Sequence, residues 1–214
     1  MIDVYTTSTA NSQRPMIMLE EVGLPYRKHF VDREKKEQRR PEFLAINPLG
    51  ALPVIIDHDA PGGPLTVTQS TAILMYLGDK TGKLLPRDGG GETRARAEVL
   101  ECTILAIQDL HGAITQIFIA NQRMEAGPGR EWALKFHGER LDKYLSECER
   151  RIAARGGWLA GEYSIADIIA FTSLNAPANF PRIRDNPAFS ALRDWHARIA
   201  ARPAVQRGIA ATAP

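Results

Sequence analysis

The residues best placed to bind a ligand through their backbone lie between Asn47 and Ile56. An Asn-Pro pair and Gly50 indicate a turn. The β-branched residues Val54–Ile56 then predict a buried strand. Because a proline cannot donate to a sheet ladder, Pro53 should begin this strand or lie on an edge. A cis bond before Pro53 would hold the Leu52 backbone open for an extended ligand, whereas a trans bond would simply open an ordinary strand; these residues alone leave both alternatives open.

A second candidate site lies where Gln69 and Ser70 open a predicted helix. The free N–H groups and partial positive charge of a helix N-terminus bind carboxylates. The hydroxyl of Ser70 adds a further hydrogen-bonding group. The alternative is that Ser70 serves only as the cap of its helix.

The two cysteines, Cys102 and Cys148, are 46 positions apart in segments with a helical pattern. The sequence contains no CxxC pair and no cluster of His and Cys, which argues against structural zinc and against a dithiol redox motif. Both cysteines have apolar neighbours, so we interpret them as small buried hydrophobic residues. We therefore predict no metal site.

The first 80 residues or so predict a thioredoxin-like order of elements, βαβαββα. A βαβ unit followed by a hairpin and a helix should form a four-stranded mixed sheet with helices on its faces. The predicted strands are Ile2–Tyr5, Tyr26–Val31, Val54–Ile56 and a short one around Leu65–Val67, and the predicted helices run from Ser12 or Arg14 to Val22, around Pro41–Leu44, and from Gln69 or Ser70 to Leu77, closed by Gly82.

After a linker rich in glycine, the pattern becomes helical to the end of the chain. We predict domains at residues 1–81 and 93–214, joined by the linker 82–92. The expected helices of the second domain are Thr93–Asn121, Glu131–Ala154, an almost wholly apolar and therefore buried Ile165–Leu174, and a last main helix that starts at Asn186-Pro187 and stops at Arg202-Pro203. The fold class is thus α/β plus all-α.

Composition excludes several classes of partner. The 214 residues carry a net charge of +2, which is too small to imply nucleic acid or an acidic membrane surface. No stretch approaches the roughly 20 apolar residues of a membrane span. The first residues lack the basic region and apolar run of a signal peptide. We expect a cytoplasmic protein with no nucleic-acid or membrane partner.

Three stretches resemble the cytosolic glutathione transferases, and the resemblance covers essentially the whole chain. They are Asn47–Pro53, Thr68–Leu77 and Trp158–Asp167. The first two together are specific, whereas the third is a folding motif. The subgroup that the chain resembles most is the bacterial nu class of disulfide-bond oxidoreductases. The resemblance implies a thioredoxin-like domain followed by a helical domain, with glutathione as co-substrate and no metal.

The resemblance also implies which residues bind glutathione. The proline at Pro53 is cis in the family, and the backbone of Leu52 pairs with the cysteinyl part of glutathione as an added strand. Gln69 and Ser70 would bind the γ-glutamyl end, although many family members have an acid where this chain has Gln69. Gln38 precedes an Arg-Pro-Glu-Phe run as in the nu class and would hold the glycyl carboxylate, with a solvated charged turn as the alternative.

The reacting atom in this resemblance is the sulfur of glutathione, as a thiolate. Its donors must lie in the polar loop after the first strand, which contains no cysteine; this argues against chemistry through a protein thiol. Thr9 and Asn11 resemble the Thr-x-Asn of the nu class, with Ser12 in reserve. The alternative is that they are only turn and cap residues. Lys135 lies in a predicted helix that could reach across a dimer interface, where nu-class members resemble one another in having a basic residue. Family members are usually dimers, so the resemblance implies a homodimer.

The predicted activity is therefore glutathione-dependent reduction of small disulfides by thiol–disulfide exchange. One alternative is conjugation of glutathione to a carbon electrophile, which needs the same thiolate but another second pocket. A different alternative is a non-catalytic member that binds glutathione or a protein partner.

Overall fold

The computed structural model describes residues 1–87 and 93–214. The chain divides into two compact units, Met1–Lys83 together with Ala200–Pro214, and Leu84–Ile199. The segment Ala200–Pro214 thus groups with the first unit, although the sequence analysis assigned it to the helical domain. Part of the predicted linker, 88–92, lies outside the described residues. Each unit is described by itself below.

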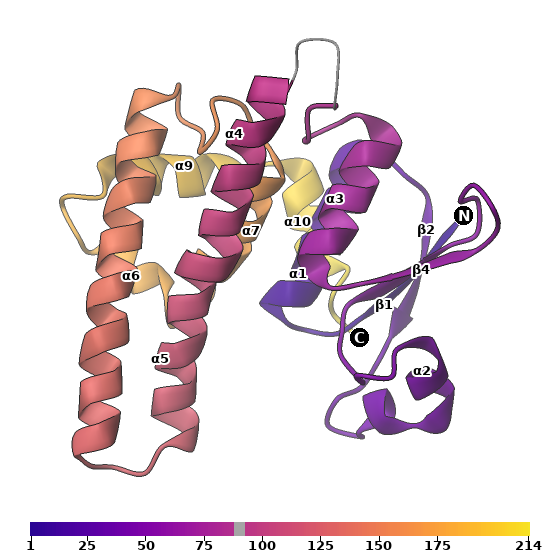
Figure 1. Ribbon diagram of the computed structural model, residues 1–214, viewed down its shortest axis with the longest axis horizontal. Helices are drawn as coiled ribbons and strands as arrows, with labels where there is room; N and C mark the ends of the chain where they lie inside the picture. The colour runs from indigo at the N-terminus through magenta and orange to yellow at the C-terminus, as the bar shows by residue number, and fades with distance from the viewer. Residues whose placement is uncertain (88–92) are drawn as a thin grey trace. The chain divides into compact units, whose positions relative to one another are not determined.

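The first unit contains the predicted four-stranded mixed sheet, in the order β2-β1-β3-β4 (Figure 1). The strand β1 pairs in parallel with β2 and antiparallel with β3, which in turn pairs antiparallel with β4. The parallel pair requires a crossover connection, and the helix between β1 and β2 provides it. The strands are β1 (Ile2–Thr6), β2 (Tyr26–Phe30), β3 (Val54–Asp57) and β4 (Leu65–Thr68).

The two faces of this sheet are covered by different helices. In the register, Tyr5 lies opposite Val54 and Val4 lies opposite Ile55. Because side chains alternate along a strand, these two pairs face opposite sides. Tyr5 and Val54 pack with Phe43 of α2, and α1 packs against α3, which also contacts β3. The helices of this unit are α1 (Ala10–Val22), a 3-10 turn (Glu37–Arg39), α2 (Pro41–Ile46), α3 (Ser70–Thr81) and α10 (Pro203–Ala210).

Helix α10 was missed because Arg202-Pro203 was interpreted as a stop. Proline is well suited to the first position of a helix, and Pro203 begins α10 there. The helix packs on α1 so closely that a Cβ on Gly208 would lie 2.6 Å from the Ile17 Cα. Arg202 also makes a bidentate ion pair with Glu21 of α1, at 2.7 and 2.8 Å. These contacts explain why the end of the chain groups with the first unit.

The second unit is helical, as predicted. Its longest predicted helix is continuous from Thr93 to Arg123 but contains a π-helical segment in the middle. Figure 1 shows α5 and α6 side by side in this unit, and the two helices pack against each other. The elements are α4 (Thr93–Ile104), the π segment (Leu105–Leu110), α5 (His111–Arg123), α6 (Pro128–Ala154), α7 (Ile165–Leu174), α8 (Phe180–Arg184) and α9 (Ser190–Ala200).

Helix α7 is the buried centre of this unit, and every one of its residues is buried. Its N-terminus has the predicted capping box, in which the Asp167 carboxylate accepts from the Ser164 backbone N–H at 3.0 Å. The same carboxylate accepts from the indole N–H of Trp195 at 2.8 Å and from the Leu159 N–H at 3.1 Å. The cap therefore ties α7 to α9 and to the preceding loop.

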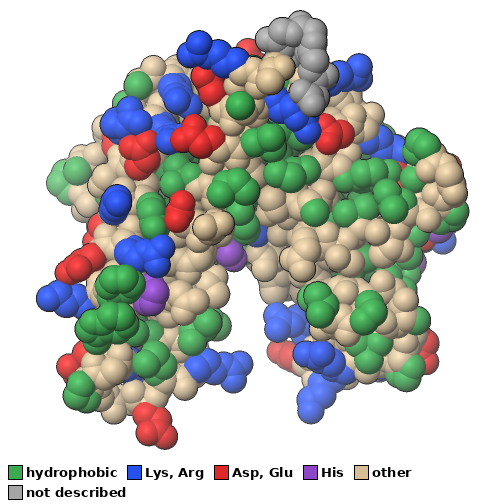
Figure 2. Space-filling view, in the orientation of Figure 1, with side chains coloured by type: hydrophobic (Ala, Val, Ile, Leu, Met, Phe, Trp, Pro, Cys, Tyr) green, Lys and Arg blue, Asp and Glu red, His purple; other side chains and the backbone are tan. Residues whose placement is uncertain are grey.

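The helix Thr93–Arg123 is long and apolar enough to cross a membrane by length and composition. Core helices of globular proteins meet the same criterion, and here α4 and α5 pack on α7 and α6. Several apolar side chains are nevertheless exposed near the junction of α5 and α6, where Figure 2 shows hydrophobic side chains gathered on the surface. They include the ring of Trp132, which stacks on Phe136 with centroids 5.0 Å apart.

Candidate functional site

The peptide bond between Leu52 and Pro53 is cis. This is the geometry that the family resemblance implied and that the local residues left open. Pro53 is buried directly before β3, and Leu52 is half-buried. Leu52 makes no backbone hydrogen bond to any residue in the described part of the chain. Its N–H and C=O are therefore available to an extended ligand, as in strand addition.

The loop before Leu52 is shaped by its own polar groups. The buried Asn47 donates from Nδ2 to the Ala51 carbonyl at 2.8 Å and accepts at Oδ1 from the Leu49 N–H at 3.2 Å. Gly50 has a φ of +60°, which favours glycine. It also lies against the backbone of Gln38. The loop thus positions Leu52 and Gln38 together.

A cavity of about 290 Å³ brings four of the predicted site residues together: Thr9, Asn11, Gln38 and Leu52 all line it. Asn11 Oδ1 and Gln38 Oε1 are buried without a hydrogen-bond partner among the described residues. Since buried polar atoms are normally hydrogen-bonded, two such atoms in one cavity indicate a site built for a polar ligand. The remaining lining residues are Thr7, Arg33, Arg39, Leu49, Gly50 and Ala51.

Thr9 is the N-cap of α1, where its Oγ1 accepts from the Ser12 N–H at 3.3 Å. This capping bond uses the oxygen as acceptor and leaves the hydroxyl hydrogen to donate into the cavity. The cap interpretation and the donor interpretation of Thr9 are therefore compatible. Ser12 is fully buried, accepts from the Thr7 N–H at 3.3 Å and lines neither cavity described here. The role of Ser12 as a reserve donor stays a prediction.

A larger cavity of about 530 Å³ shares several walls with the first one. Thr7, Thr9, Arg33 and Gln38 line both. Arg33 makes no ion pair with another described residue, so its charge is available to a ligand. The walls found only in the larger cavity are Ser8, Phe30, Asp32, Glu34 and Pro214.

The N-terminus of α3 differs from those of α1 and α7, because no side chain caps it. Gln69 precedes it with a φ of +67° and an exposed side chain. A non-glycine residue with positive φ costs conformational energy, and such residues cluster at functional sites. Ser70 is nearly buried, and its Oγ accepts from the Nη1 of Arg14 at 3.0 Å. The free backbone N–H groups of α3 can therefore receive an anionic ligand.

Sequence reasoning missed three arginines in this unit. Arg14 lies in an apolar helix, and nothing in its local sequence indicates a contact 56 residues away. In the charged segment before Gln38, Lys35 pairs with Asp32 at 3.0 Å. Arg33 and Arg39 line the smaller cavity instead. The sequence could have indicated Arg33 and Arg39, because they lie on either side of the candidate residue Gln38.

Lys135 is not among the residues that line these cavities. It lies exposed on α6, in the second compact unit. Its predicted role at an interface between two subunits stays a prediction.

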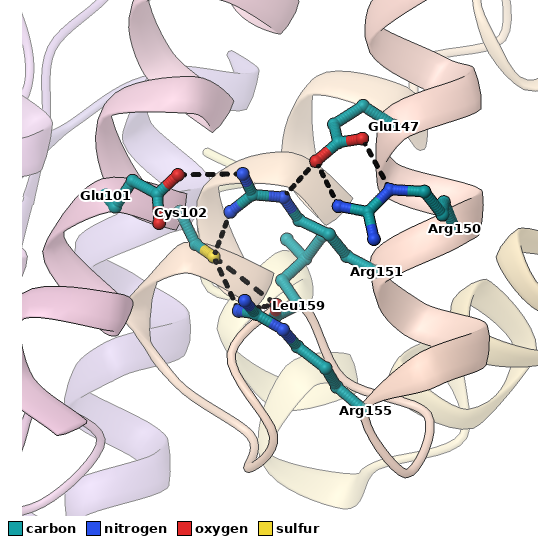
Figure 3. Close-up of polar contacts among 7 residues, drawn as sticks. All are labelled: Glu101, Cys102, Glu147, Arg150, Arg151, Arg155 and Leu159. Atoms are coloured by element: carbon teal, nitrogen blue, oxygen red, sulfur yellow. Dashed lines mark hydrogen bonds and ion pairs between the residues drawn. The ribbon is translucent and has the colours of Figure 1, made fainter. Parts of the chain in front are cut away.

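The two cysteines are buried and form no disulfide bond with each other. Cys102 donates to the Leu159 carbonyl at 3.3 Å and lies 3.2 Å from the Nη1 of Arg151, which also pairs with Glu101 (Figure 3). Burial raises the pKa of the Cys102 thiol, and it raises that of Cys148 to about 12. A thiol with a raised pKa is a poor nucleophile at neutral pH. In the described ranges, no group of three or more His, Cys, Asp or Glu side chains could hold a metal ion.

Comparison with known proteins identifies the family. Residues 10–80 match the model of the glutathione S-transferase N-terminal domain, and residues 108–210 match that of the C-terminal domain. The Escherichia coli disulfide-bond oxidoreductase YfcG is 36% identical over 98% of this chain and 94% of its own length. The chain belongs to the glutathione transferase family. Plant members also match this transferase, such as glutathione S-transferase F10 of Arabidopsis thaliana, which is 28% identical over 78% of this chain and 77% of its own length.

Solved structures show the same fold. A glutathione transferase family member from Pseudomonas fluorescens, solved with two glutathione molecules bound, matches with a TM-score of 0.86 and 31% identity over 97% of this chain and 92% of that one. A glutathione transferase from Pseudomonas putida, solved with one glutathione disulfide bound per subunit, matches with a TM-score of 0.85 and 29% identity over 97% and 90%. Glutathione thus occupies structural neighbours of this transferase.

Proposed function

We propose that this glutathione transferase binds glutathione along Leu52 and uses its thiolate to reduce small disulfides. The observation that carries the proposal is that three groups without hydrogen-bond partners belong to residues that line the same cavity. Within residues 1–87 and 93–214, the Leu52 backbone makes no hydrogen bond, and the buried amide oxygens of Asn11 and Gln38 have no partner. All three residues line one cavity of about 290 Å³. A tripeptide with several N–H and C=O groups satisfies such a set.

We assign the parts of glutathione to different groups of the first unit; Gln69 and Ser70 are not among the residues that line the two cavities. The cysteinyl backbone would pair with Leu52 as an added strand. The γ-glutamyl carboxylate would dock at Ser70 and the uncapped N-terminus of α3. The glycyl end would lie towards Gln38 and Arg33, whose guanidinium is suited to a carboxylate.

Hydrogen-bond donors near the glutathione sulfur would make the thiol reactive by lowering its pKa. An ordinary cysteine thiol has a pKa of about 8.5, so little thiolate forms at neutral pH. The Thr9 hydroxyl and the Asn11 amide N–H groups, helped by the N-terminus of α1, would stabilise the charged form and lower this pKa. No protein cysteine lines the cavity, and the nucleophile is therefore the ligand itself.

Reduction of a disulfide would proceed in two exchanges. The bound thiolate attacks one sulfur of the disulfide, a mixed disulfide forms, and the first product leaves as a thiolate that takes up a proton. A second glutathione thiolate attacks the glutathionyl sulfur, which releases the second product and leaves glutathione disulfide. Two glutathione molecules thus supply the two electrons. The activity named for YfcG and the glutathione disulfide bound in the Pseudomonas putida protein support this order.

The test is a side-by-side assay with glutathione and either 2-hydroxyethyl disulfide or an aryl chloride. We expect turnover of the disulfide well above turnover of the chloride, and saturable heat on calorimetric titration with glutathione. Activity with the chloride alone would favour conjugation. Binding without either activity would favour a non-catalytic member, and no binding at all would refute the proposal.

We further propose that the protein is a homodimer in which Lys135 reaches the partner's site. Its exposure on α6 and the exposed apolar side chains nearby are consistent with an interface. Light scattering should give twice the chain mass of 23.7 kDa. Lys135→Ala should weaken glutathione binding without changing the mass; a monomer would refute this part of the proposal.

A further inference from the structure

Arg14 is an unusual residue for the interior of α1. Its side chain is fully buried, and so are the five residues that follow it, Pro15–Leu19. Burying a charged group is costly and normally points to a specific partner or role. Burial lowers the pKa of Arg14 to about 10. The guanidinium is therefore still charged at neutral pH.

The charge of Arg14 is directed to the start of α3. Its Nη1 donates to the Ser70 Oγ at 3.0 Å. Because this bond uses the oxygen as acceptor, the hydroxyl hydrogen of Ser70 is free to donate outward. Arg14 thus fixes both the position and the polarity of the Ser70 hydroxyl.

The positive charge of Arg14 lies near the N-terminus of α3, where a negative charge would stabilise the helix. The N-terminus of a helix carries a partial positive charge and is stabilised by acidic residues. The first turn of α3 contains no acidic residue, and Gln69 before it is neutral. Arg14 places a guanidinium within hydrogen-bond distance of Ser70 at this helix start. A helix start with this combination is suited to an anionic ligand.

We propose that Arg14 is a positioning residue which, through Ser70, makes the site select ligands with a carboxylate at the γ-glutamyl end. This inference rests on the proposed binding of glutathione and assigns a residue to its specificity. The positive potential at Ser70 favours a charged ligand over a neutral one of the same shape. A purely structural arginine would instead affect all ligands alike.

The test compares glutathione with its analogue in which the glutamyl α-carboxylate is an amide. Calorimetric titrations would use the full chain as wild type, Arg14→Met, Arg14→Lys and Ser70→Ala. We expect the wild type to prefer glutathione over the amide. Arg14→Met should lower affinity for glutathione by about 10- to 100-fold, because Ser70 would no longer be held to make its hydrogen bond to the charged carboxylate, and it should leave affinity for the amide nearly unchanged. Arg14→Lys should retain most of the preference because the charge stays.

A matched control separates this effect from general destabilisation. Arg202→Met removes an arginine that pairs with Glu21 in the same unit, and it should leave the preference unchanged even if the melting temperature falls. If Arg14→Met does not fold, Ser70→Ala keeps the inference testable, because it should reduce the same preference with Arg14 in place. A preference for glutathione over the amide that survives in folded Arg14→Met overturns the role of Arg14. If the methionine variant is unfolded, a preference that survives in Ser70→Ala overturns it. If the wild-type protein binds neither glutathione nor the amide analogue, the proposed function itself is refuted.

Discussion

Gly50 lies directly against Gln38: a Cβ on residue 50 would be 2.8 Å from the Gln38 carbonyl oxygen and 2.9 Å from the Arg39 guanidinium. The loop before Pro53 and the segment that holds Gln38 therefore fit together only with glycine at this position. Both segments line the cavity of about 290 Å³. The spacing between Leu52 and Gln38 thus depends on a close backbone contact rather than on either side chain.

The first prediction is that Gly50→Ala weakens glutathione binding. The new methyl group must push the loop away from Gln38 because backbone atoms cannot yield cheaply. We expect glutathione affinity to fall by at least roughly tenfold by calorimetry. The control is Gly23→Ala, since Gly23 has a similar φ of +76° but open space around its Cβ position. Both variants should lose about 1 to 2 kcal/mol of stability from the positive φ; equal affinities in the two variants would contradict the prediction.

The second prediction concerns the donors to the sulfur. Combining Thr9→Ala with Asn11→Ala should raise the pKa of the bound glutathione thiol, and it should reduce turnover more than affinity because Leu52, Gln38 and the N-terminus of α3 still hold the tripeptide. The thiolate absorbance of the complex, followed against pH, measures this pKa. Thr9→Ala also removes the cap of α1, at a cost of about 1 kcal/mol. Thr9→Ser keeps both the cap and the hydroxyl, so it should behave like wild type; normal turnover in the double variant would show that these residues are only turn and cap residues.

The sequence predicted those parts of the fold that depend on local patterns. The limits of α7 were predicted as found, because its capping box and its apolar run are both contained in consecutive residues. Helix α1 begins at Ala10 rather than at Ser12, because Thr9 provides the cap. The last main helix begins at Ser190 rather than at Asn186-Pro187, and the short α8 before it was not predicted.

The clustering of candidate residues was predictable where it repeats a family motif and not where it depends on distant contacts. Thr9, Asn11, Gln38 and Leu52 do line one cavity. The pairing of Arg14 with Ser70 was not predictable, because a buried arginine gives no local sign of which distant residue it will contact. The cis state of Pro53 likewise depends on the surrounding structure, and only the resemblance implied it.

The third prediction is that Asp167→Ala strongly destabilises the helical unit. The carboxylate accepts from the Trp195 indole, from the Leu159 backbone and from both donors of Ser164. Its removal leaves these buried donors unsatisfied, at a cost of about 3 to 5 kcal/mol in urea unfolding. Asp185→Ala is the matched control, because Asp185 is exposed and pairs only with its neighbour Arg184 in the described structure. A similar small loss in both variants would contradict a structural role for the capping box.

The fourth prediction is a pH dependence of stability that comes from His196. Its ring stacks on Phe180 with centroids 4.4 Å apart, and its Nε2 lies 3.1 Å from the Asn175 Oδ1. Burial lowers the pKa of His196 to about 4, from an ordinary 6.5. Between these values the unfolded chain binds the proton and the folded chain does not, so this stability is fully present above pH 6.5 and is lost as the pH falls towards 4. The difference amounts to about 3 kcal/mol. His196→Phe should flatten the dependence of the urea midpoint on pH in this window; an unchanged slope would show that other groups cause it.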